Sequence, residues 1–206
     1  MRIITGKFRG RNLLKSDHLK SLRPTTDKNR EALFNILSFG KFDKGLAKGL
    51  AKGLAKGLAE GLAEGLDFKL IDSKILDLCC GSGSIGFEAL SRGAKFITFI
   101  DNNREHLELV KKNAELLKVE SDSEIICADA RNLLANKNEF DLIFLDPPYS
   151  EDSLPIIKNL LEKNFIHEKT LLVVEMKSGK EPESFLPLTL LETRKYGSTS
   201  FNFLRK

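Results

Sequence analysis

The sequence lacks any long apolar segment, and its longest apolar runs are only the length of a β-strand. A membrane-spanning helix needs about 20 apolar residues, so we expect no membrane association. The first ten residues, MRIITGKFRG, lack the apolar core of a signal peptide. We therefore expect a globular protein that resides in the cytoplasm.

Cysteine and histidine are also scarce, with three of each in the chain. The cysteines form no C-x-x-C pair, which argues against a disulfide framework and against a zinc site. The histidines stand alone in hydrophilic stretches, and we expect them at the surface without a metal. These residues are Cys79, Cys80, Cys127, His18, His106 and His167.

Positive charge is concentrated at the start of the chain. Residues 1–30 contain nine Lys or Arg and two Asp, a net charge of +7, whereas the whole chain carries +4. These cations recur every few residues and are mixed with Phe8, Gly6 and Gly10, which suits a surface that follows a phosphate backbone. A run of charge alone is more often an ordinary solvated face, so a second observation has to decide between the two.

The pattern divides the chain into three parts. Residues 1–43 predict a basic β-hairpin, with strands near 2–6 and 12–15, and a helix within 25–38. Residues 44–66 repeat a Gly-Leu-Ala-Lys/Glu tetrapeptide, whose leucines would wind around a helix because four residues turn it by about 400°. Here we expect a low-complexity insertion in a surface loop, with a membrane or partner contact as the alternative.

Residues 67–206 alternate apolar, strand-like runs with helical patterns from Ile75 onward. This alternation predicts an α/β fold, a mostly parallel sheet with helices on both faces. After Pro187, two strand-like runs flank Gly197 with no helix between them. They predict an antiparallel C-terminal hairpin that closes the sheet.

A glycine motif follows the first of these strands. GSGSIG, from Gly81 to Gly86, has the spacing G-x-G-x-x-G, and Asp101 stands twenty residues after Gly81 at the end of the next strand. Such a loop accommodates dinucleotides. The spacing alone does not choose between a nicotinamide and another adenosine cofactor.

The sequence DPPY, from Asp146 to Tyr149, ends the fourth strand of the series. At this end of an open α/β sheet, side chains point into the crevice where ligands bind. Two prolines make the turn rigid and leave its carbonyls free to accept hydrogen bonds. Asp146 and the Pro147 carbonyl would each accept a hydrogen bond from an amino group on a planar ring, and Tyr149 would stack on that ring.

DPPY and LDLCCGSGSIGFEALSRGA together resemble the class I S-adenosylmethionine-dependent methyltransferases that methylate exocyclic amino groups. RIITGKFRGRNL, LRPTTDKNREALFNIL and KYGSTSFNFL further resemble the RsmD-like bacterial 16S rRNA guanine-N2 methyltransferases, over nearly the whole chain except the repeat. The resemblance implies a Rossmann-like methyltransferase sheet and methyl transfer to N2 of one guanine in a small-subunit hairpin loop. The chain departs from the family at Cys79-Cys80, which is often Phe-Ala, and at Asp101, which is often Glu.

The resemblance also implies roles for individual residues. Contacts to S-adenosylmethionine are expected from Asp77, Gly81, Ser82, Gly83, Asp101, Asp129 and Ala130, with Asp101 on the ribose and Asp129 on the adenine amino group. The catalytic residues that hold the guanine are expected to be Asp146, Pro147, Pro148 and Tyr149. With an RNA substrate, the basic N-terminus becomes a predicted RNA-binding surface formed by Arg2, Lys7, Arg9, Arg11, Arg23 and Arg30. We expect a monomer that acts on 16S rRNA or the small ribosomal subunit.

Three other functions remain open at this point. An amino methyltransferase of DNA adenine or cytosine, or of protein glutamine, would use a similar four-residue turn. An RNA-binding protein would keep the fold without catalysis, although the intact glycine and DPPY motifs argue against it. A nicotinamide oxidoreductase is the third, and a test of cofactor binding would exclude it.

Overall fold

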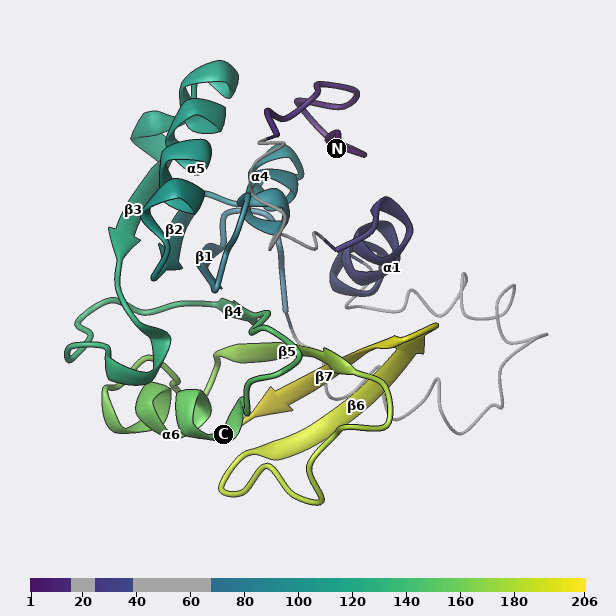
Figure 1. Cartoon of the computed structure of the whole chain (residues 1–206), viewed down its shortest axis with the longest axis vertical. Helices are drawn as coiled ribbons and strands as arrows, with labels where there is room; N and C mark the ends of the chain where they lie inside the picture. The colour runs from purple at the N-terminus through teal and green to yellow at the C-terminus, as the bar shows by residue number, and fades with distance from the viewer. Residues whose placement is uncertain (16–24, 39–67) are drawn as a thin grey trace.

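Seven strands form one sheet in the order β3-β2-β1-β4-β5-β7-β6, in a computed structural model that describes residues 1–15, 25–38 and 68–206 (Figure 1). The predicted repeat at 44–66 lies outside these described residues, as do His18 and Arg23. The strands are β1 (Lys74–Leu78), β2 (Phe96–Asp101), β3 (Ser123–Cys127), β4 (Leu142–Leu145), β5 (Leu171–Lys177), β6 (Thr189–Tyr196) and β7 (Thr199–Arg205). The helices are α1 (Asp27–Ser38), α4 (Ser84–Ser91), α5 (Arg104–Leu117) and α6 (Leu154–Glu162), with the short 3-10 helices η1 (Glu120–Asp122) and η2 (Ala130–Asn132).

The pairing of the strands confirms the predicted α/β sheet. β1 is the middle one of the five parallel strands: it pairs with β2 and β4, and the parallel part extends to β3 and β5. β7 is antiparallel to both β5 and β6, so the chain after Pro187 closes the sheet as the predicted hairpin around Gly197. The carboxyl ends of the five parallel strands therefore meet at one edge of the sheet.

The two faces of the sheet are covered by different helices. Because successive side chains of a strand point to opposite faces, Ile75 belongs to one apolar cluster and the next residue, Leu76, to the other. The first cluster includes buried residues of α1, α4 and α5, and the second includes buried residues of α6 (Figure 1). In the described part of the chain, no helix is long and apolar enough to cross a membrane.

The N-terminal hairpin is held both by backbone hydrogen bonds between its arms and by side chains of the helices. The strands predicted near 2–6 and 12–15 are not formed as strands: the two arms share one isolated bridge, between Arg2 and Asn12, and three backbone hydrogen bonds of 2.9–3.1 Å. The backbone N–H groups of Ile4 and Thr5 donate to the carboxylate of Glu88 on α4 at 2.7 and 3.1 Å. These contacts fasten the hairpin to α4.

The same N-terminal segment contributes to the main core. Ile3 and Phe8 are buried in the apolar cluster that also contains Phe34 of α1 and Leu90 of α4. This continuity of the core does not test the boundary at residue 43, which stays a prediction.

Candidate active site

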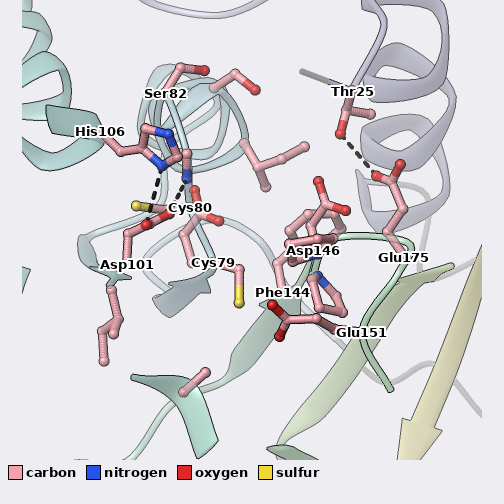
Figure 2. A pocket seen from close by; sticks show the side chains of 18 of the residues that line it. Thr25, Cys79, Cys80, Ser82, Asp101, His106, Phe144, Asp146, Glu151 and Glu175 are labelled. Atoms are coloured by element: carbon pink, nitrogen blue, oxygen red, sulfur yellow. Dashed lines mark hydrogen bonds and ion pairs between the residues drawn. The ribbon is translucent and has the colours of Figure 1, made fainter. Parts of the chain in front are cut away.

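The carboxyl ends of the parallel strands border a cavity of about 540 Å³. The strand order reverses at β1, between β2 and β4, and this is where open α/β sheets bind their ligands. Figure 2 shows two groups of side chains around the cavity, Asp101 and His106 in one group and Asp146 with Glu175 in the other. The cavity therefore has two chemically distinct halves.

The glycine motif forms the loop between β1 and α4, and Gly81 and Ser82 line the cavity. Gly83 precedes α4 with a φ of 73°, in the left-handed region that favours glycine. A Cβ on Gly86 would lie 2.3 Å from the ring of Phe99, so α4 approaches β2 this closely because the residue has no side chain. The motif thus fixes the helix against the sheet and leaves room beside the loop.

Asp77 lies on β1 below this loop and is 2% exposed. Its Oδ2 atom accepts a 2.9 Å hydrogen bond from the backbone N–H of Gly86. Burial raises the pKa of Asp77 to about 7, and the charge of Asp101 acts in the same direction. Asp77 therefore fixes the start of α4, and it also lines the cavity at the position predicted for a cofactor contact.

Asp101 ends β2 and accepts three hydrogen bonds or close contacts. Its Oδ2 accepts from the N–H of Gly81 at 2.9 Å, and its Oδ1 accepts from the N–H of Asn103 at 2.9 Å and lies 3.2 Å from Nδ1 of His106. Burial raises the pKa of this carboxyl, but the hydrogen bonds outweigh burial and bring the pKa below its usual value. The carboxylate is therefore ionised at neutral pH and suited to accept hydrogen bonds from hydroxyl groups.

The prediction that His106 lies at the surface is wrong. Its side chain is 13% exposed and lines the cavity beside Asp101. Asn103 starts α5 by accepting the N–H groups of Glu105 and His106, which places His106 in the first turn of the helix, facing the end of β2. Nε2 of His106 is buried and has no hydrogen-bond partner among the described residues.

Asp129 and Ala130 follow β3 and line the same half of the cavity. Both oxygens of Asp129 accept hydrogen bonds from the guanidinium of Arg131, at 3.0 and 2.7 Å. The hydrogen bonds from Arg131 lower the pKa of Asp129. Each carboxylate oxygen accepts more than one hydrogen bond, so Arg131 does not prevent a contact between Asp129 and an adenine amino group.

The DPPY turn borders the other half of the cavity, at the end of β4. The N–H of Asp146 donates to the carbonyl of Leu78 at 3.2 Å, which continues the pairing of β4 with β1. Pro147 is buried and Pro148 is exposed. The hydroxyl of Tyr149 donates to Oε1 of Glu175 at 3.2 Å, so the ring is anchored at the cavity wall.

The sequence analysis missed several residues in this half of the cavity. Glu175 comes from β5, and its Oε2 accepts a 2.9 Å hydrogen bond from the hydroxyl of Thr25. Other missed residues that line the cavity are Thr26, Asn29, Ser198 and Thr199. One signal was present in the sequence, because Glu175 follows four apolar residues of a strand that is otherwise typical of a core.

The Glu175 carboxylate affects the pKa of Asp146 in this half of the cavity. Burial raises the pKa of Asp146 well above its ordinary value, and the negative charges of Glu175 and Asp77 raise it further. A hydrogen-bond donor brought by a ligand would stabilise the ionised form of Asp146. This half of the cavity is therefore suited to a ligand that offers several donors.

A separate surface carries the basic residues of the N-terminus. Lys7, Arg9 and Arg11 are exposed and form what we call the basic turn. The side chains of Lys7 and Arg11 lie over the ring of Phe8, at 5.1 and 5.8 Å from its centre. Arg2 is also exposed, at 69% of its side chain.

Arg30 does not belong to this surface, which corrects the prediction of an RNA contact. It is 1% exposed, and its guanidinium donates to the carbonyl of Arg2 at 2.7 Å and to Asp27 at 2.9 Å. Arg30 Nε lies 3.9 Å from Glu88. Four residues after Thr26, the side chain points into the protein because α1 turns this face toward α4.

No group of three or more His, Cys, Asp and Glu side chains in the described ranges is placed to hold a metal ion. All three cysteines are free thiols.

Comparison with known proteins shows that nearly the whole chain matches one protein family. The model of a family described as conserved hypothetical protein 95 matches residues 1–48 and 58–205. The chain is 33% identical over 211 residues to ribosomal RNA small subunit methyltransferase D of Haemophilus influenzae, covering 98% of this chain and 91% of that protein. It is 33% identical over 189 residues to the Escherichia coli protein with the same name, covering 91% of this chain and 78% of that protein.

A solved structure agrees with these matches. The Escherichia coli protein yhhF, a candidate methyltransferase, superposes with a TM-score of 0.73 at 28% identity. The superposition covers 100% of this chain and 97% of that one. The sheet, the glycine loop and the DPPY turn thus lie in a fold that this structure shares along its length.

Proposed function

Because the chain belongs to the conserved hypothetical protein 95 family, with ribosomal RNA small subunit methyltransferase D proteins as relatives, we propose that it is an S-adenosylmethionine-dependent methyltransferase of 16S rRNA. We propose further that the acceptor is the exocyclic N2 of one guanine. The enzyme would act in the cytoplasm as a monomer, on 16S rRNA or the small subunit.

One observation supports this function above the others. The cavity places the ionised carboxylate of Asp101 in one half and the DPPY turn with Asp146 in the other. A methyltransferase needs these two kinds of site side by side, because cofactor and acceptor must meet in one place.

The residues of the first half fit S-adenosylmethionine. Asp101 is suited to accept hydrogen bonds from the ribose hydroxyls, and the loop at Gly81 leaves space for the ligand. Nε2 of His106, which has no partner in the described part of the chain, adds a polar atom at the same place. Asp129 and Ala130 are proposed to hold the adenine, and Asp77, Ser82 and Gly83 the methionine end and ribose. When bound, this cofactor supplies a methyl group on a positively charged sulfur.

The residues of the second half act on the acceptor amino group. The lone pair of an aromatic amine is delocalised into its ring, which makes it a poor nucleophile. Hydrogen bonds from the amino group to Asp146 and to the Pro147 carbonyl favour the pyramidal nitrogen, whose lone pair is available. The carboxylate of Asp146 also stabilises positive charge that develops on nitrogen, and a buried site strengthens this effect. Tyr149 would stack on the base, with Pro148 completing the turn.

The RNA must present an accessible base and bind outside the cavity. A base paired in a duplex cannot enter such a site, so the guanine is expected in a loop or extruded. The basic turn is bound to Ser91, at the end of α4 opposite the glycine loop. Eight residues of helix span about 12 Å, so the basic turn lies roughly this far from the glycine loop and would contact phosphates outside the cavity. Arg2 would add to this contact.

The experiment that tests the proposal is transfer of labelled methyl from S-adenosylmethionine to small ribosomal subunits that lack the modification. Naked rRNA and DNA serve as parallel substrates, and the products are identified by nucleoside analysis. We expect labelled N2-methylguanosine. Label on DNA or on protein alone would contradict the substrate, and bound cofactor without any transfer would favour a non-catalytic RNA-binding protein.

Two variants make this assay specific for the DPPY turn. Asp146→Asn keeps the size of the side chain but removes its charge, and we expect a loss of at least about 100-fold in kcat. Asp152→Asn makes the same change at an exposed residue nearby and should retain activity, because an amide oxygen can also accept the hydrogen bond from the N–H of Leu154.

A further inference from the structure

Glu175 is a buried carboxylate in the middle of the sheet. It lies on β5 and is 4% exposed, yet it lines the same cavity as Asp146 (Figure 2). Burying a charged group is costly unless hydrogen bonds or opposite charges compensate for the lost water. The contacts of Glu175 therefore indicate what this carboxylate does.

Two hydroxyl groups hold the Glu175 carboxylate in place. Thr25 donates to Oε2 at 2.9 Å, and Tyr149 donates to Oε1 at 3.2 Å. The hydroxyl of Tyr149 also lies 3.0 Å from that of Thr199 on β7. Three separate segments thus fix the orientation of Glu175, and its oxygens can accept further hydrogen bonds from a ligand.

The hydrogen bonds from Thr25 and Tyr149 do not themselves require a negative charge on Glu175. The amide of a glutamine could bond to both hydroxyls, because a hydroxyl group accepts as well as donates. The charge of Glu175 also opposes ionisation of its neighbour, since burial and this charge together raise the pKa of Asp146. A ligand that brings hydrogen-bond donors to both carboxylates would stabilise their ionised forms.

Among the bases with an exocyclic amino group, guanine alone has a second donor beside it. Its N1 carries a hydrogen next to the amino group at carbon 2. In adenine and cytosine, the ring nitrogen beside the amino group is an acceptor, which a carboxylate would repel. Enzymes that act on an unstacked base recognise it by hydrogen bonds to this Watson–Crick edge.

We propose that Glu175 accepts the hydrogen bond from N1–H of the target guanine while Asp146 binds its N2 amino group. The proposal rests on the function proposed above and names the residue that selects the base. Glu175 is then a specificity residue, and Thr25 and Tyr149 position it. The pair of carboxylates would exclude adenine and cytosine even where those bases can enter the cavity.

The first test needs no variant. Wild-type protein is given unmodified small-subunit RNA in which the guanosine that it methylates is replaced by 2-aminopurine riboside. This base keeps the amino group at carbon 2 but has an acceptor at N1. We expect kcat/KM for 2-aminopurine to be roughly 10- to 100-fold lower than for guanine, the discrimination that a well-placed hydrogen-bond pair provides. Equal values for the two bases would overturn the inference.

The second test uses Glu175→Gln, whose amide can donate to N1 of 2-aminopurine. We expect kcat/KM to fall for guanine but not for 2-aminopurine, so the preference for guanine shrinks by about tenfold or more. An equal loss on both bases, with the preference unchanged, would give Glu175 a purely structural role and overturn the inference.

Two controls accompany these tests. Glu183→Gln makes the same change at an exposed residue between β5 and β6 and should keep the wild-type preference. Titration with S-adenosylmethionine establishes that Glu175→Gln is folded. If this variant does not fold, equal kcat/KM values of the wild-type protein on the two bases would still overturn the inference. Absence of guanine methylation by wild-type protein would instead contradict the proposed function itself, before Glu175 is tested.

Discussion

Oε2 of Glu88 accepts a 2.7 Å hydrogen bond from the backbone N–H of Ile4, which fastens the start of the chain to α4. Glu88 is fully buried, and its Oε1 also accepts a 2.7 Å hydrogen bond from the side chain of Arg92. The buried guanidinium of Arg30 lies 3.9 Å from the same carboxylate. The Glu88 carboxylate thus accepts hydrogen bonds from two backbone N–H groups of the N-terminal segment and balances the positive charges of Arg30 and Arg92.

We predict that Glu88→Ala lowers the free energy of unfolding by about 3–5 kcal/mol, because it leaves buried charge without its partner. Urea denaturation followed by circular dichroism measures the change. Glu31→Ala, at an exposed position of α1, is the control and should change stability by less than about 0.5 kcal/mol. A similarly small effect of Glu88→Ala would show that the N-terminal segment does not depend on this carboxylate.

Asp77 predicts a pH dependence of stability. Its pKa is raised from 3.8 to about 7 in the folded protein, so between these values the folded state holds a proton that the unfolded state has lost. The contribution of Asp77 to stability therefore falls as the pH rises from about 4 to about 7 and levels off above that. Asp77→Asn removes this fall while an amide oxygen can still accept the N–H of Gly86.

The measurement is the free energy of unfolding of wild-type protein and Asp77→Asn across this pH range. We expect the variant to gain stability relative to wild type as the pH rises. Two curves that stay parallel from pH 4 to pH 7 would contradict a raised pKa at Asp77.

Asp146 and Glu175 predict the pH dependence of methyl transfer. Protonation of Asp146 removes the negative charge that stabilises the positive charge developing on the amino nitrogen, so activity is lost as the pH falls through its raised pKa. The acid limb of kcat/KM against pH should therefore lie well above the ordinary range of an aspartate near 4. In Glu175→Gln one negative charge is removed, which lowers the pKa of Asp146 and moves the limb to lower pH.

The measurement is kcat/KM against pH for wild-type protein and Glu175→Gln. The prediction concerns the pH at which the acid limb lies, and a change in the maximum value of kcat/KM does not test it. Glu183→Gln should show the wild-type limb. A limb that stays in place in Glu175→Gln would mean that the charge of Glu175 does not act on Asp146.

The basic turn predicts the salt dependence of RNA binding. Charge reversal of Lys7, Arg9 and Arg11 removes up to three phosphate contacts, and each lost contact should reduce the slope of log K against log salt concentration by about 1. Filter binding or fluorescence anisotropy at several salt concentrations measures this slope, and S-adenosylmethionine affinity should be unaffected. Three exposed lysines outside the N-terminal segment give a control with the same change in net charge: Lys137, Lys158 and Lys169. Equal slopes for the two triple variants would remove the basic turn from the RNA interface.

Local patterns in the sequence were sufficient to predict the elements of the sheet domain and about half of the site, but the two short N-terminal strands they predicted form only an isolated bridge. The apolar runs at β1 to β5 and the helical spacing of α4, α5 and α6 predicted the sheet and its covering helices, because periodicity reports burial directly. Gly81 to Gly86 and Asp146 to Tyr149 lie in contiguous motifs at strand ends, so their meeting at one edge follows from the parallel topology alone.

Contacts between distant segments were decided only by the tertiary structure. Thr25 and Glu175 are 150 residues apart, and no local pattern indicates that a hydroxyl before α1 bonds to a carboxylate on β5. The same holds for Arg30, which belongs by sequence to a basic run but lies buried beside Glu88. The sequence predicted His106 at the surface, but the start of α5 places it beside Asp101.

The physical reason for this division is that burial and hydrogen bonding depend on position in space, whereas periodicity and short motifs depend on neighbours along the chain. The sequence by itself determined the α/β sheet, the cofactor loop and the DPPY turn. The tertiary structure alone decided which charges are buried, which hydroxyls orient Glu175, and that a second carboxylate lies in the same half of the cavity as Asp146 (Figure 2).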